Sequence, residues 1–241
     1  MSEHGGNKAM TPRKNNKDLL LSVIIPVFNE EKTVSEVIDR VMSLDIPKEI
    51  IVIDDCSRDA SRLILERMTN ICLLSHHVNS GKGAAIRTGL AQAKGDVVVV
   101  QDADLEYNPQ DLLILLRLIK EDRADVVYGS RFLGSYQGMR FQNVLGNKFL
   151  TWLTNLLFGA KITDMETCYK MMRASVLEGV SLRANRFDFE PEITAKILKK
   201  RVRFLEVPIS YSGRTHSEGK KIGWKDGFHA IYSLVKYRIL D

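Results

Sequence analysis

The chain has 241 residues, of which 44% are hydrophobic, so it can bury a sizeable core, but no uninterrupted apolar run approaches the roughly 18 to 20 residues that a membrane-spanning helix requires. A net charge of +5 favours anionic partners such as phosphorylated substrates or acidic lipid headgroups, and nucleic acid is disfavoured because the basic residues form no stripe interleaved with aromatics. Three cysteines without metal-like spacing, and no secretory leader, indicate a reducing cytoplasmic setting.

The first elements along the chain are a polar tail, a strand and a helix. Residues 1–18 lack apolar periodicity and are predicted to be a disordered tail. The apolar run 19–28 predicts a buried strand that stops pairing near Pro26, because proline cannot donate to a ladder. Asn29 and the two glutamates after it are typical of a helix start, and apolar residues then recur with helical spacing at Val34, Val37, Ile38 and Val41.

Strands and helices alternate as far as residue 130. The patterns predict strands at 49–53, 72–76, 95–100 and 125–130, and helices at 63–68, at 84–93 and from Pro109 onward. Short connections between such elements imply right-handed crossovers and a parallel sheet. We therefore predict that the residues up to 130 form one doubly wound α/β unit.

The alternation weakens in the second half. Residues 144–158 have an amphipathic helical period, which suits either a helix packed on the sheet or a helix lying in a membrane interface. A helix near Pro191, a strand at 202–211, a basic loop and a last amphipathic helix at 223–239 are predicted to follow. The expected organisation is one catalytic domain at 19–213, with the basic loop and last helix forming a separate unit at 214–241.

Three acids at alternate positions follow the central strand. Its four consecutive valines, 97–100, suit a strand buried on both faces, and open α/β sheets bind ligands at the carboxyl ends of their strands. Side chains two residues apart point the same way while the chain is extended, so Asp102, Asp104 and Glu106 are candidates to hold one hard cation, Mg²⁺ or Mn²⁺. Taken alone, such a pattern is more often a solvated acidic turn, so the interpretation depends on its neighbours.

Four predicted strand ends deliver polar residues to one rim of the sheet. They are the segments 26–30, 54–59, 79–83 and 102–106. Acids alternating with a lysine and glycines suit a nucleotide diphosphate held through a divalent cation. The first strand lacks the Gly-x-Gly-x-x-Gly pattern and no Gly-x-x-x-x-Gly-Lys-Ser/Thr occurs, which disfavours dinucleotide oxidoreductases and P-loop phosphotransferases.

These segments resemble the ordered motifs of family 2 glycosyltransferases, and most closely those of dolichyl- or polyprenyl-phosphate hexose synthases. The similarity spans residues 20 to about 238 and rests on Pro26-Val27-Phe28-Asn29-Glu30, Asp54-Asp55-x-Ser57-x-Asp59, Asn79-x-Gly81-Lys82-Gly83, Asp102-Ala103-Asp104-Leu105 and Gly129-Ser130-Arg131. The resemblance implies a GT-A fold, which is a Rossmann-like doubly wound and mostly parallel sheet flanked by helices. It also implies an inverting mechanism, a nucleoside diphosphate sugar donor, and Mg²⁺ or Mn²⁺.

The resemblance also assigns residues to the donor side. It implies a metal pair of Asp102 and Asp104, with Glu106 as a third ligand although family members often have Gln there. The remaining donor-pocket residues that it implies are Pro26, Asn29, Glu30, Asp54, Asp55 and Lys82. The chemistry is consistent, because a bridging cation stabilises the charge that develops on a departing diphosphate.

The identity of the acceptor decides which further residues are needed. A phosphate monoester is largely dianionic at neutral pH and needs cations rather than a strong base, and Arg131, Arg214 and Lys220 are the candidates. A sugar hydroxyl needs a general base, for which Asp164 is the candidate, although Asp164 is equally suited to orient a basic side chain. Glu190 and Glu192 are similar candidates that also fit the role of helix-start acids.

We therefore expect a cytoplasmic, inverting glycosyltransferase that moves a hexosyl group from a donor of the UDP-glucose or GDP-mannose type to polyprenyl or dolichyl phosphate. Peripheral contact with the cytoplasmic face of a membrane is expected through the helix at 144–158 and the last helix. One alternative is the same fold transferring the sugar to a saccharide hydroxyl with Asp164 as base. Another is a non-catalytic module that binds nucleotide sugars.

Overall fold

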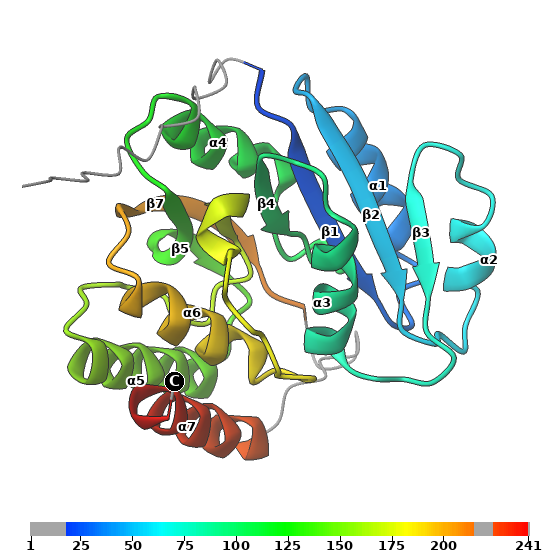
Figure 1. Cartoon of the computed structure of the whole chain (residues 1–241). Helices are drawn as coiled ribbons and strands as arrows, with labels where there is room; N and C mark the ends of the chain where they lie inside the picture. The colour runs from blue at the N-terminus through cyan, green and yellow to red at the C-terminus, as the bar shows by residue number, and fades with distance from the viewer. Residues whose placement is uncertain (1–17, 215–223, 241) are drawn as a thin grey trace, which may run out of the picture.

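The computed structural model describes residues 18–214 and 224–240, and within them seven strands form one sheet with the order β3-β2-β1-β4-β6-β5-β7 (Figure 1). The predicted tail, apart from Asp18, lies outside the described residues. The strands are β1 (Leu21–Val27), β2 (Lys48–Asp54), β3 (Cys72–Ser75), β4 (Val97–Val100), β5 (Val126–Gln137), β6 (Lys170–Arg173) and β7 (Phe204–Ser212).

The middle of the sheet is parallel and buried on both faces. β1 pairs with β2 on one side and with β4 on the other, and the register places Val27 opposite Asp54. The side chains of β1 alternate between two packing layers, since Val23 and Ile25 belong to the main hydrophobic cluster while Ile24 packs with Ala85 on the opposite face. This arrangement confirms the α/β fold class and the mostly parallel, doubly wound sheet.

One strand corrects the sequence-based interpretation. The short β6 runs antiparallel between β4 and β5, so β5 does not adjoin β4 and the sheet is not completed by the residues up to 130. Its sequence, Lys-Met-Met-Arg, is four residues long with charged ends, and it carries no alternation that marks a strand. β5 is also longer than predicted, because beyond an irregularity between Ser130 and Ser135 it continues beside β7 to Gln137.

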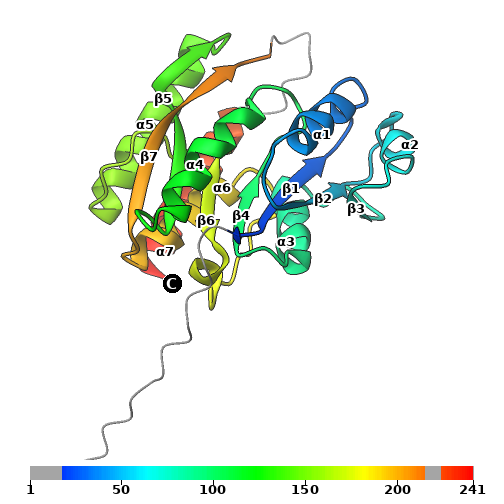
Figure 2. The same cartoon turned by 90° about the horizontal axis from the view of Figure 1, so that it is seen from above.

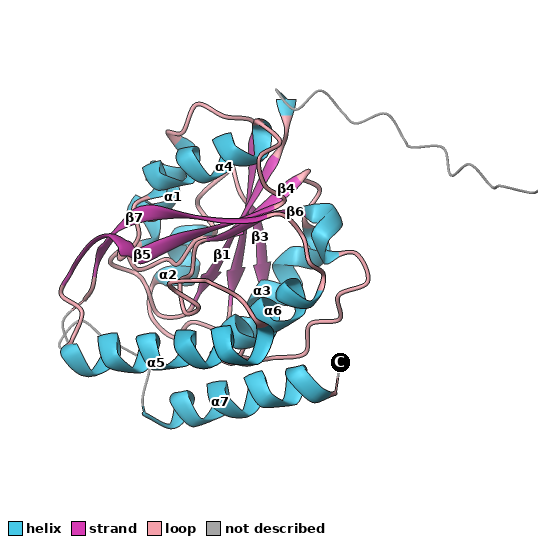
Figure 3. Cartoon of the chain, turned by 90° about the vertical axis from the view of Figure 1, so that its left-hand side faces the viewer, coloured by secondary structure: helices cyan, strands magenta, loops and turns pink. Residues whose placement is uncertain are grey.

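Helices cover both faces of the sheet. Figure 3 shows α1 (Val34–Met42) and α4 (Leu112–Lys120) on one side, and α3 (Lys82–Gln92) and α6 (Phe189–Lys199) on the other. The short α2 (Ser61–Leu65) and β3 lie at one edge of the sheet, and β5 and β7 lie at the opposite edge (Figure 2). Two short 3-10 helices, η2 (Pro109–Asp111) and η3 (Ala174–Leu177), complete this part of the chain.

Two long helices lie side by side below α6. They are α5 (Phe141–Phe158) and α7 (Trp224–Ile239), and they share a small apolar cluster that includes Leu150 and Leu234 (Figure 3). The predicted helices at 144–158 and 223–239 are thereby confirmed as helices. Among the described residues, none of the helices combines the length and apolar character needed to cross a bilayer.

Candidate active site

The topology gathers the ends of several strands at one edge of the sheet. Because β6 pairs antiparallel with both of its neighbours, β5 and β7 run in the same direction as β1, β2 and β4. The carboxyl ends of all these strands therefore meet at one edge, which is where open α/β sheets bind ligands. This edge receives the segments after β1, β2 and β4, and Arg214 after β7.

The loops after β1 and β2 hold each other in place. Asn29 adopts a left-handed conformation with φ of 55°, which asparagine tolerates better than most residues, and its side-chain oxygen accepts the backbone N–H of Arg58 at 2.7 Å. Asp54 is fully buried, and its Oδ1 accepts the N–H of Ser57 at 3.1 Å. Its Oδ2 has no hydrogen-bond partner among the described residues, so it is a candidate acceptor for an N–H of a ligand.

Asp55 has a different position from Asp54. Its carboxylate accepts the backbone N–H groups of Ser80 and Gly81 at 2.8 Å each, and it contacts His76 Nδ1 at 2.7 Å. These bonds fix the loop that leads into α3 and so fix the start of the helix at Lys82. Asp55 is thus a buried residue that holds the loop before α3 in place.

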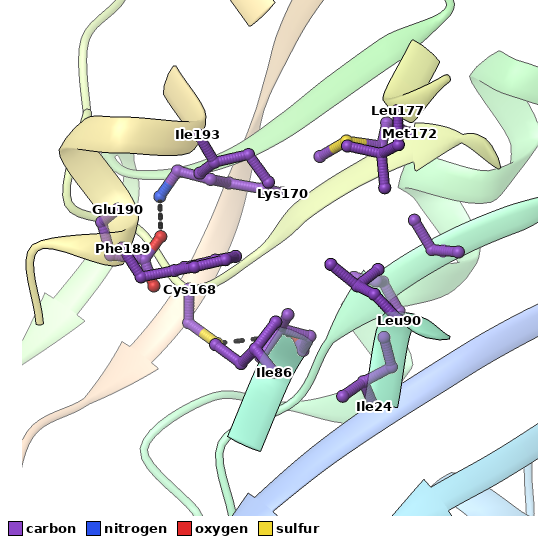
Figure 4. Close-up of a pocket in the computed structure, with 13 residues that line it drawn as sticks. Ile24, Ile86, Leu90, Cys168, Lys170, Met172, Leu177, Phe189, Glu190 and Ile193 are labelled. Carbon is purple, nitrogen blue, oxygen red and sulfur yellow. Dashed lines mark hydrogen bonds and ion pairs between the residues drawn. The ribbon is translucent and has the colours of Figure 1, made fainter. Parts of the chain in front are cut away.

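A chain of alternating charges runs inward from the edge. Lys82 Nζ lies 2.7 Å from Asp102 and 3.7 Å from Glu190. Glu190 also pairs with the buried Lys170, as Figure 4 shows. Burial alone would lower the Lys82 pKa, but the carboxylates of Asp102 and Glu190 more than offset this and hold that pKa well above its usual value. Glu190 is therefore occupied by two lysines and is not a free base.

A small cavity lies behind this charge chain. Its volume is about 10 Å³, and side chains of α3, α6 and the neighbouring strands line it, with the Lys170–Glu190 pair at its rim (Figure 4). A space of this size is only about large enough for one water molecule. This cavity is therefore too small to hold a nucleotide sugar.

Arg214 joins two acids that follow different strands. Its guanidinium makes two hydrogen bonds with Glu30, at 2.8 and 3.1 Å, and a third with Asp104 at 3.1 Å. Burial and the nearby charges of Asp102 and Glu106 raise the pKa of Asp104 to about 7, although Arg214 opposes this. The crowding of negative charge around Asp104 is what a bound cation would relieve.

Glu106 does not join the predicted metal pair. Its carboxylate accepts the Tyr211 hydroxyl at 2.6 Å and the backbone N–H of Arg214 at 2.8 Å, so both of its oxygens are bound to β7 and the residues after it. Within the described parts of the chain, no three His, Cys, Asp or Glu side chains are arranged to hold a metal ion. With both oxygens of Glu106 engaged, Asp102 and Asp104 remain as the predicted ligand pair, and a pair suits Mg²⁺ because this ion is usually held by one or two carboxylates plus substrate phosphates.

Arg131 and Asp164 form a buried pair further along the same edge. Both carboxylate oxygens of Asp164 accept guanidinium N–H groups of Arg131 at 2.7 Å, and one also accepts its backbone N–H at 3.0 Å. Asp164 is fully buried, and the guanidinium lies 5.2 Å from the centre of the Tyr211 ring. The geometry is that of a carboxylate that orients an arginine.

Two candidates remain, Glu192 and Lys220. Glu192 is fully buried and accepts the backbone N–H groups of Arg183 and Ala184, so it stabilises the loop before α6 and is not available as a base. Lys220 lies outside the described residues. Sequence reasoning missed the structural contributions of Tyr211 and Lys170, because both act through partners that are distant in the sequence.

With its mostly parallel sheet flanked by helices, the chain has the GT-A fold. The model of the family described as "Glycosyl transferase family 2" matches residues 22–180, which is more than half of the chain. The chain belongs to glycosyl transferase family 2, as its motifs predict, and is an enzyme of the hexosyltransferase type.

Several curated relatives have names that combine a sugar with a dolichyl or polyprenyl phosphate. A UDP-N-acetylglucosamine–dolichyl-phosphate N-acetylglucosaminyltransferase of Methanococcus voltae is 27% identical, with 92% of this chain and 97% of the relative aligned. A dolichol-phosphate mannosyltransferase of Pyrococcus furiosus is 29% identical over 90% of this chain and 64% of its own length. A dodecaprenyl-phosphate galacturonate synthase of Rhizobium johnstonii is 25% identical over 91% and 66%.

Among solved structures, the chain is similar to glucosyl-3-phosphoglycerate synthase from Mycobacterium tuberculosis in complex with Mn²⁺, UDP and phosphoglyceric acid. The TM-score is 0.72, and the alignment covers 92% of this chain and 80% of that one. At 20% sequence identity, this likeness shows the shared fold. The same synthase has also been solved with Mg²⁺ and UDP.

Proposed function

We propose that this enzyme transfers a hexosyl group, with inversion, from a nucleoside diphosphate sugar to the phosphate of a polyprenyl or dolichyl phosphate, with Mg²⁺ or Mn²⁺ as cofactor. The observation that carries the proposal is the Arg131–Asp164 pair. Both Asp164 oxygens are bound by the guanidinium at 2.7 Å in a fully buried pair, which leaves no free base at this position. A phosphate acceptor needs no such base, because it is already largely dianionic at neutral pH.

In this proposal the loops after β1 and β2 bind the nucleoside of the donor. The unpartnered Oδ2 of Asp54 is suited to accept a hydrogen bond from the nucleobase, next to Asn29 and Glu30. Pro26 pairs with Ile53 in the register of β1 and β2, which places it close to the same loops. Lys82, which stands at the start of α3, supplies positive charge for the diphosphate.

The metal would be held by Asp102 and Asp104. When bound, it supplies charge stabilisation for the departing nucleoside diphosphate. The chain's own contribution is to present two carboxylates after a rigid buried strand, with Lys82 bonded to one of them at 2.7 Å and Arg214 to the other at 3.1 Å. These cations orient the carboxylates and lower the cost of holding two negative charges close together.

The acceptor side is built from arginines. Asp164 engages two of the five N–H donors of Arg131, and the remaining donors bond to no other described residue, so they are available to phosphate oxygens. Arg214 lies on the same edge, at the end of β7, and contacts Asp104 on the donor side. We assign these two arginines, together with Lys220, to the acceptor phosphate.

An exposed apolar platform suits a lipid acceptor. On α5 and α7 large apolar residues recur at spacings of three and four, including Trp152, which is 57% exposed, and Phe228, which is 66% exposed. Lys148 on α5 lies 5.4 Å from the ring of Phe132, the residue after Arg131, so the platform borders the proposed phosphate site. Its members are Phe141, Leu145, Phe149, Trp152 and Leu156 of α5, and Phe228, Tyr232, Val235 and Ile239 of α7.

We infer that this platform rests on the surface of an anionic membrane. Aromatic and aliphatic side chains on adjacent helices, with lysines and arginines at their borders, are typical of helices that lie in a membrane interface. Arg140 and Arg238 stand at the ends of α5 and α7, next to these stripes. A peripheral dock of this kind would present the headgroup of the lipid to Arg131 while its chain stays in the bilayer.

The test is a substrate panel followed by mass spectrometry. The purified enzyme is offered UDP- and GDP-linked hexoses and N-acetylhexosamines, each with polyprenyl phosphate, with a neutral saccharide, or with neither. We expect one class of donor to give a polyprenyl-phosphate sugar. Transfer to the saccharide without lipid phosphate would overturn the proposal in favour of a hydroxyl acceptor, and binding of donor without transfer would favour a non-catalytic module.

A further inference from the structure

The loop between α5 and β6 is fixed almost residue by residue. Between Thr163 and Cys168, each position except one makes a bond through its side chain or backbone to another part of the chain. These bonds are Thr163 Oγ1 with Ser130 Oγ (2.7 Å), Asp164 with Arg131, Met165 N–H to Thr151 Oγ1 (3.0 Å), Thr167 Oγ1 to Gly129 O (2.6 Å) and Cys168 N–H to the Tyr107 hydroxyl (3.0 Å). The loop is therefore a rigid support.

Glu166 is the exception. Its Oε1 is buried and has no partner, and within residues 18–214 and 224–240 its carboxyl group makes neither a hydrogen bond nor an ion pair. A buried oxygen without a partner costs free energy, and native structures usually supply one from protein, water or ligand. Glu166 as a whole residue is only partly buried.

Charged residues from both the proposed donor side and the proposed acceptor side act on Glu166. Burial raises its pKa to about 7, and the charges that act on it belong to Lys170, Glu190, Arg131 and Asp164. The Lys170–Glu190 pair leads through Lys82 to the donor side, and the Arg131–Asp164 pair belongs to the acceptor side. In the proposed function these two pairs flank the place where the transferred sugar would lie.

We propose that Glu166 is a sugar-binding residue, whose carboxyl group hydrogen-bonds a hydroxyl of the hexose that is transferred. The inference rests on the proposed function, since it places the transferred sugar between the donor and acceptor sides. A neutral polyhydroxy ligand suits the site because a hydroxyl both donates and accepts, so it satisfies a carboxyl group in either protonation state. A site built to bond a hydroxyl discriminates strongly against sugars that lack it.

The experiment separates binding of the sugar from binding of the nucleotide. Calorimetry measures the affinity of wild type, Glu166→Gln and Glu166→Ala for a nucleoside diphosphate and for the matching nucleotide sugar, each with Mn²⁺. We expect the nucleoside diphosphate to bind equally well to all three. Affinity for the nucleotide sugar is expected to fall about tenfold in Glu166→Gln, which keeps the shape, and about a hundredfold in Glu166→Ala. The exposed Glu178→Gln is the matched control and should behave as wild type.

Several outcomes would overturn the assignment. Equal losses for nucleotide and nucleotide sugar, or no loss for either, would mean that Glu166 does not contact the sugar. Unchanged affinity for the nucleotide sugar with abolished turnover would make Glu166 a proton acceptor instead. Failure of both variants to fold, judged by circular dichroism, would make it a structural core residue. If wild type itself binds no nucleotide sugar, the proposed function fails first, and the two failures are thereby distinguished.

Discussion

The guanidinium of Arg214 bonds Asp104 at 3.1 Å and, through two further hydrogen bonds, Glu30. A residue at the end of β7 thus links the acid that follows the central strand β4 to the acid that follows β1, across 110 and 184 positions of sequence. Because Asp104 is also a proposed metal ligand, Arg214 and a divalent ion would bind the same carboxylate.

This shared carboxylate predicts the effect of removing Arg214. Replacing Arg214 by Gln removes a cation that competes for Asp104, so Mn²⁺ binding in the absence of donor should tighten by about threefold to tenfold. Electron paramagnetic resonance of free Mn²⁺ measures this directly. Arg117→Gln, at an exposed position of α4, is the control. A weaker affinity for Mn²⁺ in Arg214→Gln would show that Arg214 supports the ion instead of competing with it.

The acceptor assignment of Arg214 gives a second measurement on the same residue. Arg214→Ala should raise the KM for polyprenyl phosphate at least tenfold, because a charge-assisted bond to phosphate is lost, while donor affinity changes much less. Steady-state kinetics with each substrate varied in turn separates the two effects. Equal changes in both constants would contradict the assignment.

The geometry of the Arg131–Asp164 pair predicts that a positive charge alone cannot replace the planar guanidinium of Arg131. Arg131→Lys keeps the positive charge but loses the planar fork, so the KM for the lipid phosphate should rise about tenfold and stability should fall by about 1–3 kcal/mol. Asp164→Asn leaves the arginine buried without its counter-charge and should cost about 3–5 kcal/mol of stability. Its residual turnover, measured at a temperature where it stays folded, should remain well above background. Complete loss in a folded Asp164→Asn variant would instead support a general base.

The raised pKa of Glu166 predicts a pH effect on stability. In the folded chain this pKa is about 7 against an ordinary value of 4.5, mainly because of burial, so the folded state retains a proton that the unfolded state loses. This group therefore subtracts stability as the pH rises from about 4.5 to about 7. The difference in free energy of unfolding, Glu166→Gln minus wild type, should increase between pH 5 and pH 8 in denaturant titrations. A difference that does not change with pH would show that Glu166 ionises normally.

The apolar platform predicts binding to membranes. Wild type should cosediment with vesicles that contain anionic lipids, and high salt should weaken this binding. Replacing Phe149 and Trp152 of α5 by Ser should abolish it without unfolding the protein. Leu63→Ser is the matched control, because Leu63 is 60% exposed on α2 but lies outside the platform. Equal binding by the platform variant and the control would exclude the platform as the dock.

Local sequence patterns predicted much of the sheet. The four valines of β4 and the apolar centres of β1 and β2 made buried parallel strands the expected interpretation, and β1 does pair parallel with both β2 and β4. The strand β6 was missed because its four residues carry no periodicity and its pairing depends on neighbours that are distant in the sequence.

The site was less predictable than the sheet because its contacts are long-range. Glu106 alternates with two aspartates in the sequence, but the Tyr211 hydroxyl, which lies 105 positions away, binds its carboxylate. The pairing of Arg214 with Glu30 likewise depends on the position of β7 in the sheet. For Glu166, only the complete set of surrounding bonds reveals that its carboxyl group is unpartnered.

The most direct test of the account is the metal dependence of sugar transfer to polyprenyl phosphate by wild type and Asp104→Asn. Product is followed by mass spectrometry after treatment with EDTA and again after Mn²⁺ is restored. We predict that EDTA abolishes transfer by wild type, that Mn²⁺ restores it, and that a correctly folded Asp104→Asn stays inactive in both conditions. Full transfer in the presence of EDTA, or wild-type turnover by Asp104→Asn, would contradict the claim that the acids after β4 hold the ion that stabilises the departing diphosphate.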